Sequence, residues 1–311
     1  MSVRPLAESP ASAGRPKTTV LTFADKRRRG EAISMVTAYD YPGARAADEA
    51  GVDAILVGDS LAMVVLGHPN TLSVTMDEML HHARAVRRGA QRALLVGDLP
   101  FMSYQTSVTD AVRNAGRYVQ EAGMDAVKLE GGGAFTDTVR AVIRAGIPVQ
   151  GHLGLTPQSV NVLGGFRVQG RDAAAARTLL EDALALEEAG CFSVVLESVP
   201  HRLASFVTER LRIPTIGIGA GSGTSGQVLV FHDLLGLYDR FSPRFAKRYA
   251  ELGTATTDAI RTYREEVEAH TFPGPEHSYA MPEEEWQAFQ AAVDTSRLDP
   301  SVPRRAGGVA R

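Results

Sequence analysis

The sequence predicts a single-domain (β/α)8 barrel, an α/β fold in which eight parallel strands alternate with helices around a closed sheet. Short runs of Ile, Leu and Val bounded by glycine recur along the chain, as in AILVGDS at residues 54–60. Such runs are typical of strands that are buried on both faces of a parallel sheet. They alternate with helical segments over roughly 250 residues, because each helix must return the chain to the start of the next parallel strand.

A doubly wound open sheet is the alternative arrangement of the same elements. An open sheet gathers its ligand-binding residues near the point where the strand order reverses. In this chain, polar residues follow many of the strands, among them Asp59, Asp98, Glu130 and Glu197. This distribution favours the barrel, in which every strand contributes its carboxyl end to one face.

The predicted strands are apolar runs that end in polar residues or glycine. They span residues 33–40, 54–60, 94–100, 126–133, 147–154, 193–200 and 213–221, and the eighth lies in the apolar run QVLVFHDLLGL at 227–237. A short helix at 18–32 precedes the first strand and leads into the barrel.

The segments between the strands have the apolar periodicity and terminal residues of helices. They span residues 41–51, 76–90, 107–123, 135–146, 172–190 and 201–211. Pro42 near the start and Gly51 at the end mark the boundaries of the first helix. Ser107 or Thr109 caps the third.

The remaining segments define the domain organisation. Residues 1–16 are rich in Pro, Ala, Ser and Gly and are predicted to be a flexible tail. Residues 17–279 form the barrel with capping helices, because 242–272 reads as two amphipathic helices suited to covering the barrel or a neighbouring subunit. Residues 280–311 are predicted to be a partly disordered extension, with a last short helix within 276–298.

The composition narrows the class of protein. The 311 residues, 44% of them hydrophobic, suffice for one large core or two ordinary domains, and the net charge of −3 provides no basic face for nucleic acid. Cys191 is the one cysteine, which argues against a disulfide framework, and its position before a strand predicts a small buried residue. No run approaches the roughly 20 apolar residues of a membrane span, and the start lacks a secretory signal, so a cytoplasmic protein is predicted.

Three acidic residues, Asp59, Asp98 and Glu130, end neighbouring predicted strands. Their carboxylates would repel one another unless they are protonated or neutralised by a cation. Mg²⁺ prefers oxygen ligands and keeps positions for water and a chelating substrate. The alternative is that each acid caps the loop or helix that follows its strand. Three acids on adjacent strands favour the metal site.

Lys128 and Ser60 are candidate anion-binding residues. Lys128 lies two residues before Glu130, so a regular strand directs both side chains into the barrel. A buried lysine requires an anionic partner, which is either a carboxylate of the protein or the carboxylate of a substrate. Ser60 follows Asp59 and can donate to the same anion or serve the turn.

Glu197 is the candidate general base, because it ends the sixth predicted strand away from the three acids and a carboxylate outside a metal site keeps its basicity. A helix cap before Pro200 is the alternative. His152, in GHLG, either contacts bound substrate or forms hydrogen bonds within the protein. The glycine-rich run at 217–223 follows the seventh strand, a phosphate position in many barrels, but close backbone packing explains it equally. No phosphorylated substrate is predicted.

Several segments of the chain resemble the ketopantoate hydroxymethyltransferase family. The resemblance covers about residues 18–279 and rests on VGDSLAMVVLGHPNTL, GDLPFMSY, VKLEGG, GHLGLTPQSVNVLGGFRVQGR, LESVP, IGIGAG and EHSY. The pair HLGLTPQSVN and GGFRVQGR is too specific to be expected by chance. Two features depart from the family's pattern: Ser225 stands where an acidic residue is expected, and the chain continues well beyond Tyr279.

The resemblance implies 3-methyl-2-oxobutanoate hydroxymethyltransferase activity in pantothenate biosynthesis, with 5,10-methylenetetrahydrofolate as the one-carbon donor. It implies that Asp59, Asp98 and Glu130 form a Mg²⁺ site, with Glu130 binding directly or through water. It also implies a homodecamer built from two pentamers.

The remaining site residues are carried over by the same resemblance. Ser60 and Lys128 match residues that hold the 2-oxo acid, and Glu197 matches the proposed base. Asp59 and Asp98, as ligands of a metal that the substrate chelates, are also predicted to lie against the substrate. His152 is counted with the substrate-binding residues on its position alone, apart from the resemblance.

Two other functions remain open. A Mg²⁺-dependent lyase or mutase of the phosphoenolpyruvate mutase and isocitrate lyase type also forms enolates of 2-oxo acids, but such lyases use a reactive loop cysteine, whereas Cys191 precedes a strand. A barrel that has lost catalysis and serves as a binding or scaffold protein is the other, and the acids at the strand ends argue against it.

Overall fold

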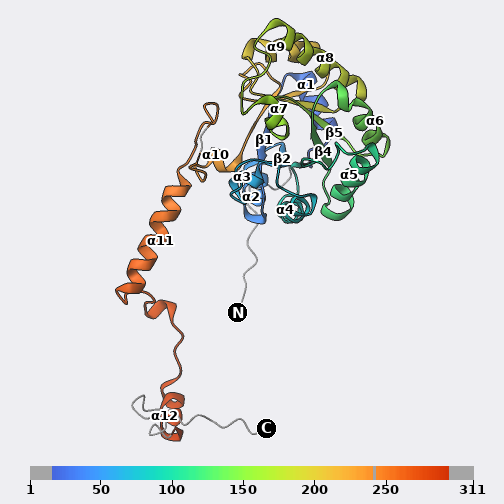
Figure 1. Ribbon diagram of the computed structural model, residues 1–311. Helices are drawn as coiled ribbons and strands as arrows, with labels where there is room; N and C mark the ends of the chain where they lie inside the picture. Colours follow the sequence, from blue (N-terminus) through green and yellow to red (C-terminus); the bar gives the residue numbers. More distant parts are fainter. Residues whose placement is uncertain (1–15, 241–242, 294–311) are drawn as a thin grey trace, which may run out of the picture. The chain divides into compact units, whose positions relative to one another are not determined.

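Eight parallel strands close into a barrel in the computed structural model, which describes residues 16–240 and 243–293 (Figure 1). Each strand pairs with the next one along the chain, and the last pairs with the first. The strands are β1 (Ile33–Thr37), β2 (Ala54–Val57), β3 (Leu94–Asp98), β4 (Ala126–Glu130), β5 (Val149–Gly154), β6 (Ser193–Glu197), β7 (Thr215–Ile218) and β8 (Gly226–Leu229). The closed order confirms the predicted barrel and excludes the open sheet.

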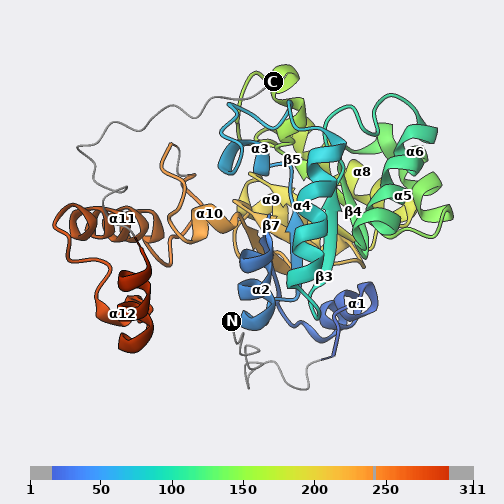
Figure 2. The same cartoon turned by 90° about the horizontal axis from the view of Figure 1, so that it is seen from below.

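The long helices surround the barrel, each packed against the next in chain order (Figure 2). They are α2 (Tyr41–Ala50), α4 (Met76–Gly89), α5 (Val108–Ala122), α6 (Thr136–Arg144), α8 (Ala173–Ala189) and α9 (His201–Arg210). Asp40 caps α2 by accepting from the Gly43 backbone N–H at 2.7 Å, and Gly51 ends this helix as predicted. Ser107 caps α5, since its hydroxyl accepts from the Asp110 backbone N–H at 3.0 Å. The structure thereby decides between Ser107 and Thr109.

The sequence analysis missed several short elements in the loops that follow strands. These are α3 (Leu61–Val64), α7 (Val160–Leu163) and α10 (Phe231–Leu234), with the 3₁₀ turns η1 (Gly133–Phe135) and η2 (Pro157–Ser159). The predicted eighth strand, 227–237, was too long, because β8 ends at Leu229. Phe231 and Leu234 are three residues apart and pack together on the core as one helical turn, which an apolar run alone does not distinguish from a strand.

Two apolar layers hold the barrel together, one between the strands and the helices and the other inside the barrel. The inner layer includes Phe23 of α1 (Val20–Arg29), which is fully buried and meets the Phe192 ring edge-on with centroids 5.6 Å apart. Phe23 packs with Ile33 and Ala54, the first residues of β1 and β2. Helix α1 therefore covers the amino-terminal end of the barrel and leaves the carboxyl ends of the strands for the site.

The glycine-rich run at 217–223 serves close packing. A side chain at Gly223 would place its Cβ 1.9 Å from the hydroxyl of Ser205 on α9, so only glycine fits there. This contact accounts for the glycine without a phosphate ligand.

The carboxyl-terminal region differs from the prediction of two helices in 242–272. One helix is present, α11 (Leu252–Glu268), and the described residues 243–250 are irregular. The Tyr249 and Leu252 backbone N–H groups donate to the carbonyls of Leu234 and Leu235, and Phe245 packs onto the inner layer of the barrel. These tertiary contacts outweigh the helical pattern of the segment.

By its internal contacts the chain divides into two units, 1–253 and 254–311. The second unit contains most of α11, then η3 (Pro275–His277) and α12 (Glu283–Ala292). Helix α12 confirms the short helix that was predicted within 276–298. The domain limits at 17–279 and 280–311 stay a prediction, and the predicted disorder of 1–15 and 294–311 concerns residues outside those described. Within 16–240 and 243–293, none of the helices combines the length and hydrophobicity needed to cross a membrane.

Candidate active site

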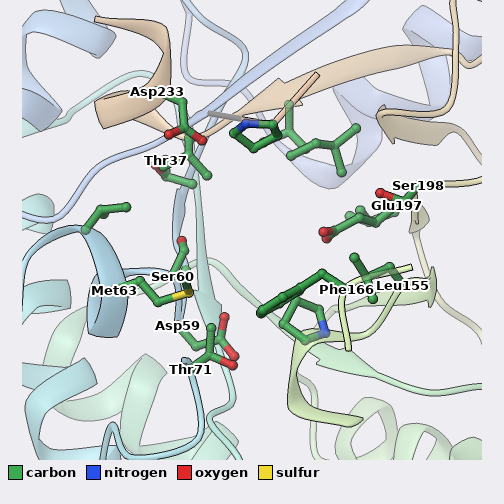
Figure 3. Close-up of a pocket in the computed structure, with 18 of the residues that line it drawn as sticks. Thr37, Asp59, Ser60, Met63, Thr71, Leu155, Phe166, Glu197, Ser198 and Asp233 are labelled. Atoms are coloured by element: carbon green, nitrogen blue, oxygen red, sulfur yellow. The ribbon is translucent and has the colours of Figure 1, made fainter. Parts of the chain in front are cut away.

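A cavity of about 850 Å³ opens at the carboxyl ends of the barrel strands (Figure 3). All the predicted site residues line it: Asp59, Ser60, Asp98, Lys128, Glu130, His152 and Glu197. They are brought together by strand register, because Asp98 on β3 lies beside Lys128 on β4, and Glu130 on β4 lies beside His152 on β5. As predicted, Lys128 and Glu130 point to the same side of their strand.

The three acids are almost completely buried and are connected through Gln158 and the backbone. Asp98 Oδ2 accepts from the Asp59 backbone N–H at 3.1 Å, and Asp59 Oδ2 accepts from Gln158 Nε2 at 3.0 Å. Glu130 Oε2 accepts from the Gln158 backbone N–H, also at 3.0 Å. These bonds orient the carboxylates but leave their negative charges close together.

The pKa values of the three acids are shifted in different directions by burial, by one another and by the neighbouring cations. Burial, followed by the charges of Asp98 and Glu130, raises the pKa of Asp59 well above its usual value. Burial also raises the pKa of Asp98, although the neighbouring Lys128 opposes the shift. The pKa of Glu130 is lowered, since contacts with His152 and Lys128 outweigh the effect of burial. Lys128 and His152 therefore do not fully offset the cost of burying three carboxylates next to one another.

Lys128 is a buried cation among these carboxylates. Its Nζ lies 2.8 Å from Asp98 Oδ1 and 3.9 Å from Glu130 Oε1. Burial disfavours the ammonium group, but Asp98, Glu130 and Asp59 outweigh it and raise the pKa of Lys128. Of the two partners that the sequence left open, the structure contains the protein carboxylate, and this lysine is charged at neutral pH.

His152 links the acid cluster to Glu197. Its Nδ1 lies 3.3 Å from Glu130 Oε1, and its Nε2 lies 3.2 Å from Glu197 Oε2. Burial and the Lys128 ammonium, 3.2 Å from Nδ1, both disfavour the imidazolium. The carboxylates of Glu130 and Glu197 outweigh them and raise the pKa of His152 to about 9. The internal contacts predicted as one alternative for His152 are thus present, and the ring also faces the cavity.

Glu197 enters the cavity from the wall that faces Asp59 and Ser60 (Figure 3). Its backbone is held by neighbouring strands, since its carbonyl accepts from the Leu155 backbone N–H at 2.8 Å. A Cβ at Gly154 would lie 2.2 Å from that carbonyl oxygen, so glycine permits this close approach. The next residue, Ser198, adopts φ 50°, a left-handed conformation that is uncommon outside glycine and often marks functional sites.

Ser60 does not act as a helix cap. It precedes α3 without a side-chain bond to the backbone of this helix, and its hydroxyl lies 2.8 Å from the hydroxyl of the buried Tyr39. Because it also lines the cavity, this hydroxyl is available to a ligand.

Gln158 and Tyr104 are central residues that sequence reasoning missed. Gln158 is 5% exposed and its Nε2 donates to Asp59 and to the Leu99 carbonyl. Its Oε1 accepts from the Tyr104 hydroxyl at 2.9 Å, and that hydroxyl accepts from the Glu130 backbone N–H at 3.1 Å. Gln158 lies in the HLGLTPQSVN segment, but in a loop after β5, where no strand pattern reveals that its side chain turns inward.

The donor set is suited to Mg²⁺ with few protein ligands. In the described part of the chain, no group of three or more Asp, Glu, His or Cys side chains is arranged to hold a metal ion. Mg²⁺ is commonly held by one or two carboxylates while water and substrate fill its other positions, and Asp59 and Asp98 meet this requirement. Glu130 Oε1 is buried and lies 3.3 Å from His152 Nδ1, but it accepts no hydrogen bond among the described residues, so it can also bind the ion or accept from its water. A divalent cation would relieve the charge repulsion that, together with burial, raises the pKa of Asp59.

Two other predicted positions lie away from this chemistry. Cys191 is buried, and burial raises the pKa of its thiol to about 12, so it is a packing residue as expected. Ser225 exchanges hydrogen bonds with Thr215 next to the start of β8 and does not line the cavity. The departure at Ser225 leaves the candidate site unchanged.

Several solved structures have a similar fold at low sequence identity. A phosphonopyruvate hydrolase in complex with oxalate and Mg²⁺ has a TM-score of 0.55 at 13% identity, covering 88% of this chain and 99% of that one. A 2,3-dimethylmalate lyase of the PEP mutase/isocitrate lyase superfamily has a TM-score of 0.55 at 17% identity, covering 91% and 98%. At such low identity these likenesses show the fold alone.

Sequence comparison is much more specific. Residues 17–275 match the family described as ketopantoate hydroxymethyltransferase. A 3-methyl-2-oxobutanoate hydroxymethyltransferase of Syntrophobacter fumaroxidans is 62% identical over 262 residues, 84% of this chain and 93% of the relative. The enzyme of the same name from Moorella thermoacetica is 60% identical over 267 residues, 86% of this chain and 99% of the relative. By both the matched range and this identity, the chain belongs to the ketopantoate hydroxymethyltransferase family.

Proposed function

We propose that this protein transfers a hydroxymethyl group from 5,10-methylenetetrahydrofolate to 3-methyl-2-oxobutanoate, giving 2-dehydropantoate and tetrahydrofolate in pantothenate biosynthesis. Family membership supports the reaction, with relatives of that name at about 60% identity. The observation that carries the proposal at the level of residues is the placement of Glu197 across one cavity from Asp59 and Ser60. A base and an anion-stabilising site on opposite sides of a bound 2-oxo acid are what removal of its C3 proton requires.

The residues divide the work as follows. Mg²⁺, held by Asp59 and Asp98 with Glu130 directly or through water, would supply a positive charge for the ketone oxygen and carboxylate of the 2-oxo acid. Lys128 and Ser60 bind the substrate carboxylate, the lysine by charge and the hydroxyl by hydrogen bonding. These contacts fix the 2-oxo acid with C3 toward the opposite wall.

Glu197 then takes the proton from C3, and the electron pair of that C–H bond passes into the enolate. His152, 3.2 Å from Glu197 Oε2, orients the carboxylate for this transfer. As the enolate carbon forms a bond to the methylene carbon of the folate, one of the two C–N bonds of that carbon breaks and the released nitrogen takes up a proton. Water then cleaves the remaining C–N bond, its hydroxyl going to the carbon and its proton to the nitrogen, and 2-dehydropantoate and tetrahydrofolate are released. The folate provides the electrophile, while the protein provides position and charge.

An assay of 2-dehydropantoate formation from the two substrates with added Mg²⁺ tests this function directly. Formation of 2-dehydropantoate that depends on both the folate and the 2-oxo acid is the expected result. Cleavage or rearrangement of other 2-oxo acids without folate would favour a lyase or mutase instead, and binding without turnover would favour a scaffold.

Gln158→Ala should reduce kcat/KM by roughly 10- to 100-fold, the usual cost of losing a residue that orients metal ligands. The amide stabilises the charged form of Asp59, so its removal raises the pKa of Asp59 further. As the pH is lowered, the variant should therefore begin to lose activity at a higher pH than wild type does. Gln150→Ala is the matched control, since Gln150 is equally buried and bonds Ser193 outside the cavity. Equal losses, or an unshifted acid limb for Gln158→Ala, would contradict the positioning role.

We also propose that the protein assembles into a homo-oligomer, with a decamer of two pentamers as the form implied by the family. Helix α11 exposes apolar side chains, with Ile260 62% and Tyr263 56% exposed. Light scattering should give a mass many times that of the 33.3 kDa chain, and Ile260→Asp should lower it. A monomer at micromolar concentration would refute the assembly.

A further inference from the structure

The cavity is much larger than a small 2-oxo acid requires. Its volume of about 850 Å³ lies in the range of roughly 300–1,000 Å³ that holds drug-sized ligands. The acids, Lys128 and His152 come from neighbouring strands, whereas other parts of the lining are apolar and include Met63, Phe166 and Val168. The cavity therefore has space beside the 2-oxo acid for a second, larger ligand.

Asp233, on α10 after β8, is a carboxylate of this cavity that the mechanism above does not use. Figure 3 shows it beside Thr37, apart from Asp59 and Glu197. It is half-buried, and its carboxylate forms no hydrogen bond or ion pair with any residue in 16–240 or 243–293, although its backbone carbonyl accepts from the Gly236 N–H at 3.4 Å. Burial raises the pKa of its carboxyl to about 6, opposed by the charge of Arg248. A partly desolvated carboxylate without donors is a site for a ligand that brings them.

We propose that Asp233 binds the pterin of the folate co-substrate by accepting hydrogen bonds from its 2-amino group and its N3–H. This inference rests on the proposed function, which requires a folate in the cavity. The two N–H groups lie side by side on one edge of the pterin and match the two oxygens of a carboxylate, an arrangement that gives strong, directional bonds. Asp233 is the lining carboxylate that lies free of the acid cluster and of His152.

The apolar lining suits the flat faces of the same ring system. Phe166 and Val168 are each 50% exposed, and both lie in the cavity wall with Met63. A planar ring system placed between them would cover this apolar surface and gain from its burial. The pterin would thus be held at one edge by Asp233 and on its faces by apolar side chains.

Two arginines of the lining suit the anionic end of the folate. Arg167 and Arg244 are exposed, and neither has an ion-pair partner in the described part of the chain. Arg240 differs, because it donates to the Gly67 carbonyl at 3.0 Å. Guanidinium groups pair well with carboxylates, so Arg167 and Arg244 would bind the glutamate carboxylates. A pterin held at its C2–N3 edge directs N5 and the bridging methylene away from Asp233, into the cavity where the 2-oxo acid lies.

Asp233→Asn tests the proposal, because it keeps the shape but replaces a charged acceptor by an amide. Tetrahydrofolate affinity measured by calorimetry should fall roughly 10- to 100-fold, the cost of losing hydrogen bonds to a charged group, with a matching rise in KM for methylenetetrahydrofolate. Exchange of the C3 proton of 3-methyl-2-oxobutanoate in D₂O needs no folate and should continue. Asp239→Asn is the control, since Asp239 follows α10 closely but does not line the cavity.

A folate analogue identifies the bonded edge. The 2-desamino-2-methyl analogue of tetrahydrofolate should bind wild type more weakly than tetrahydrofolate does. If Asp233 bonds the 2-amino group, Asp233→Asn should lose most of this difference in affinity; if another residue bonds that edge of the pterin, the variant should keep it. The assignment would be overturned if Asp233→Asn kept the wild-type difference in affinity between the two folates. It would also be overturned if the variant lost C3 proton exchange to the same extent as folate binding. Absence of turnover in the wild type would instead refute the proposed function. The affinities of wild type and Asp233→Asn for tetrahydrofolate would still test whether Asp233 binds the pterin.

Discussion

Glu197→Gln should lose about 10²- to 10⁴-fold in turnover while still binding the 2-oxo acid, because a positioned general base typically contributes on that scale. Glutamine keeps the shape of the side chain and cannot accept the C3 proton. Glu197 is the candidate because it faces Asp59 and Ser60 across the cavity, and it stands outside the cluster of acids that would hold a cation (Figure 3).

The decisive measurement for Glu197 needs no folate. Wild type in D₂O should exchange the C3 proton of 3-methyl-2-oxobutanoate, which proton NMR detects as collapse of the methyl doublet, and the variant should not. Glu209→Gln is the matched control, since Glu209 lies on α9 with a side chain that is 73% exposed. Exchange at the wild-type rate in Glu197→Gln would show that another group takes the proton.

The barrel could be predicted because each of its strands is marked by residues that are adjacent in the sequence. A run such as residues 54–57 is apolar on both faces, and the glycines and acids that follow end it within the sequence. The site could be predicted for the same reason, since a parallel barrel brings the residue after each strand to one face. The prediction that these residues meet required no knowledge of the loops between them; they are Asp59, Asp98, Glu130 and Glu197.

The missed features depend on contacts between distant segments. Gln158 reaches Asp59 and Leu99 from a loop, and nothing near Gln158 in the sequence reveals those partners. The irregular segment before α11 has a helical pattern, but its backbone donates to the carbonyls of Leu234 and Leu235. A periodic pattern reports which face of a segment is apolar, and it does not report a competing backbone partner elsewhere in the chain.

Asp59→Asn and Asp98→Asn should each abolish most of the Mg²⁺ affinity and with it the activity. Loss of a residue that merely orients a ligand costs about 10- to 100-fold in metal affinity or activity, so loss of a ligand should cost about 100-fold or more. Calorimetric titration with Mg²⁺ in the presence of 3-methyl-2-oxobutanoate measures the effect. Titrations like those of wild type would show that the two acids cap loops and do not bind the ion.

The same two variants should differ in stability when no metal is present, and this difference tests the charge balance of the cluster. Asp59 is repelled by Asp98 and Glu130, so Asp59→Asn removes an unfavourable buried charge and should keep or raise Tm. Asp98 is the nearest partner of Lys128, at 2.8 Å, so Asp98→Asn leaves a buried ammonium less well paired and should lower Tm. Thermal unfolding in EDTA compares them directly. Equal Tm values for the two variants would mean that Lys128 gains as much from Glu130 and Asp59 as from Asp98.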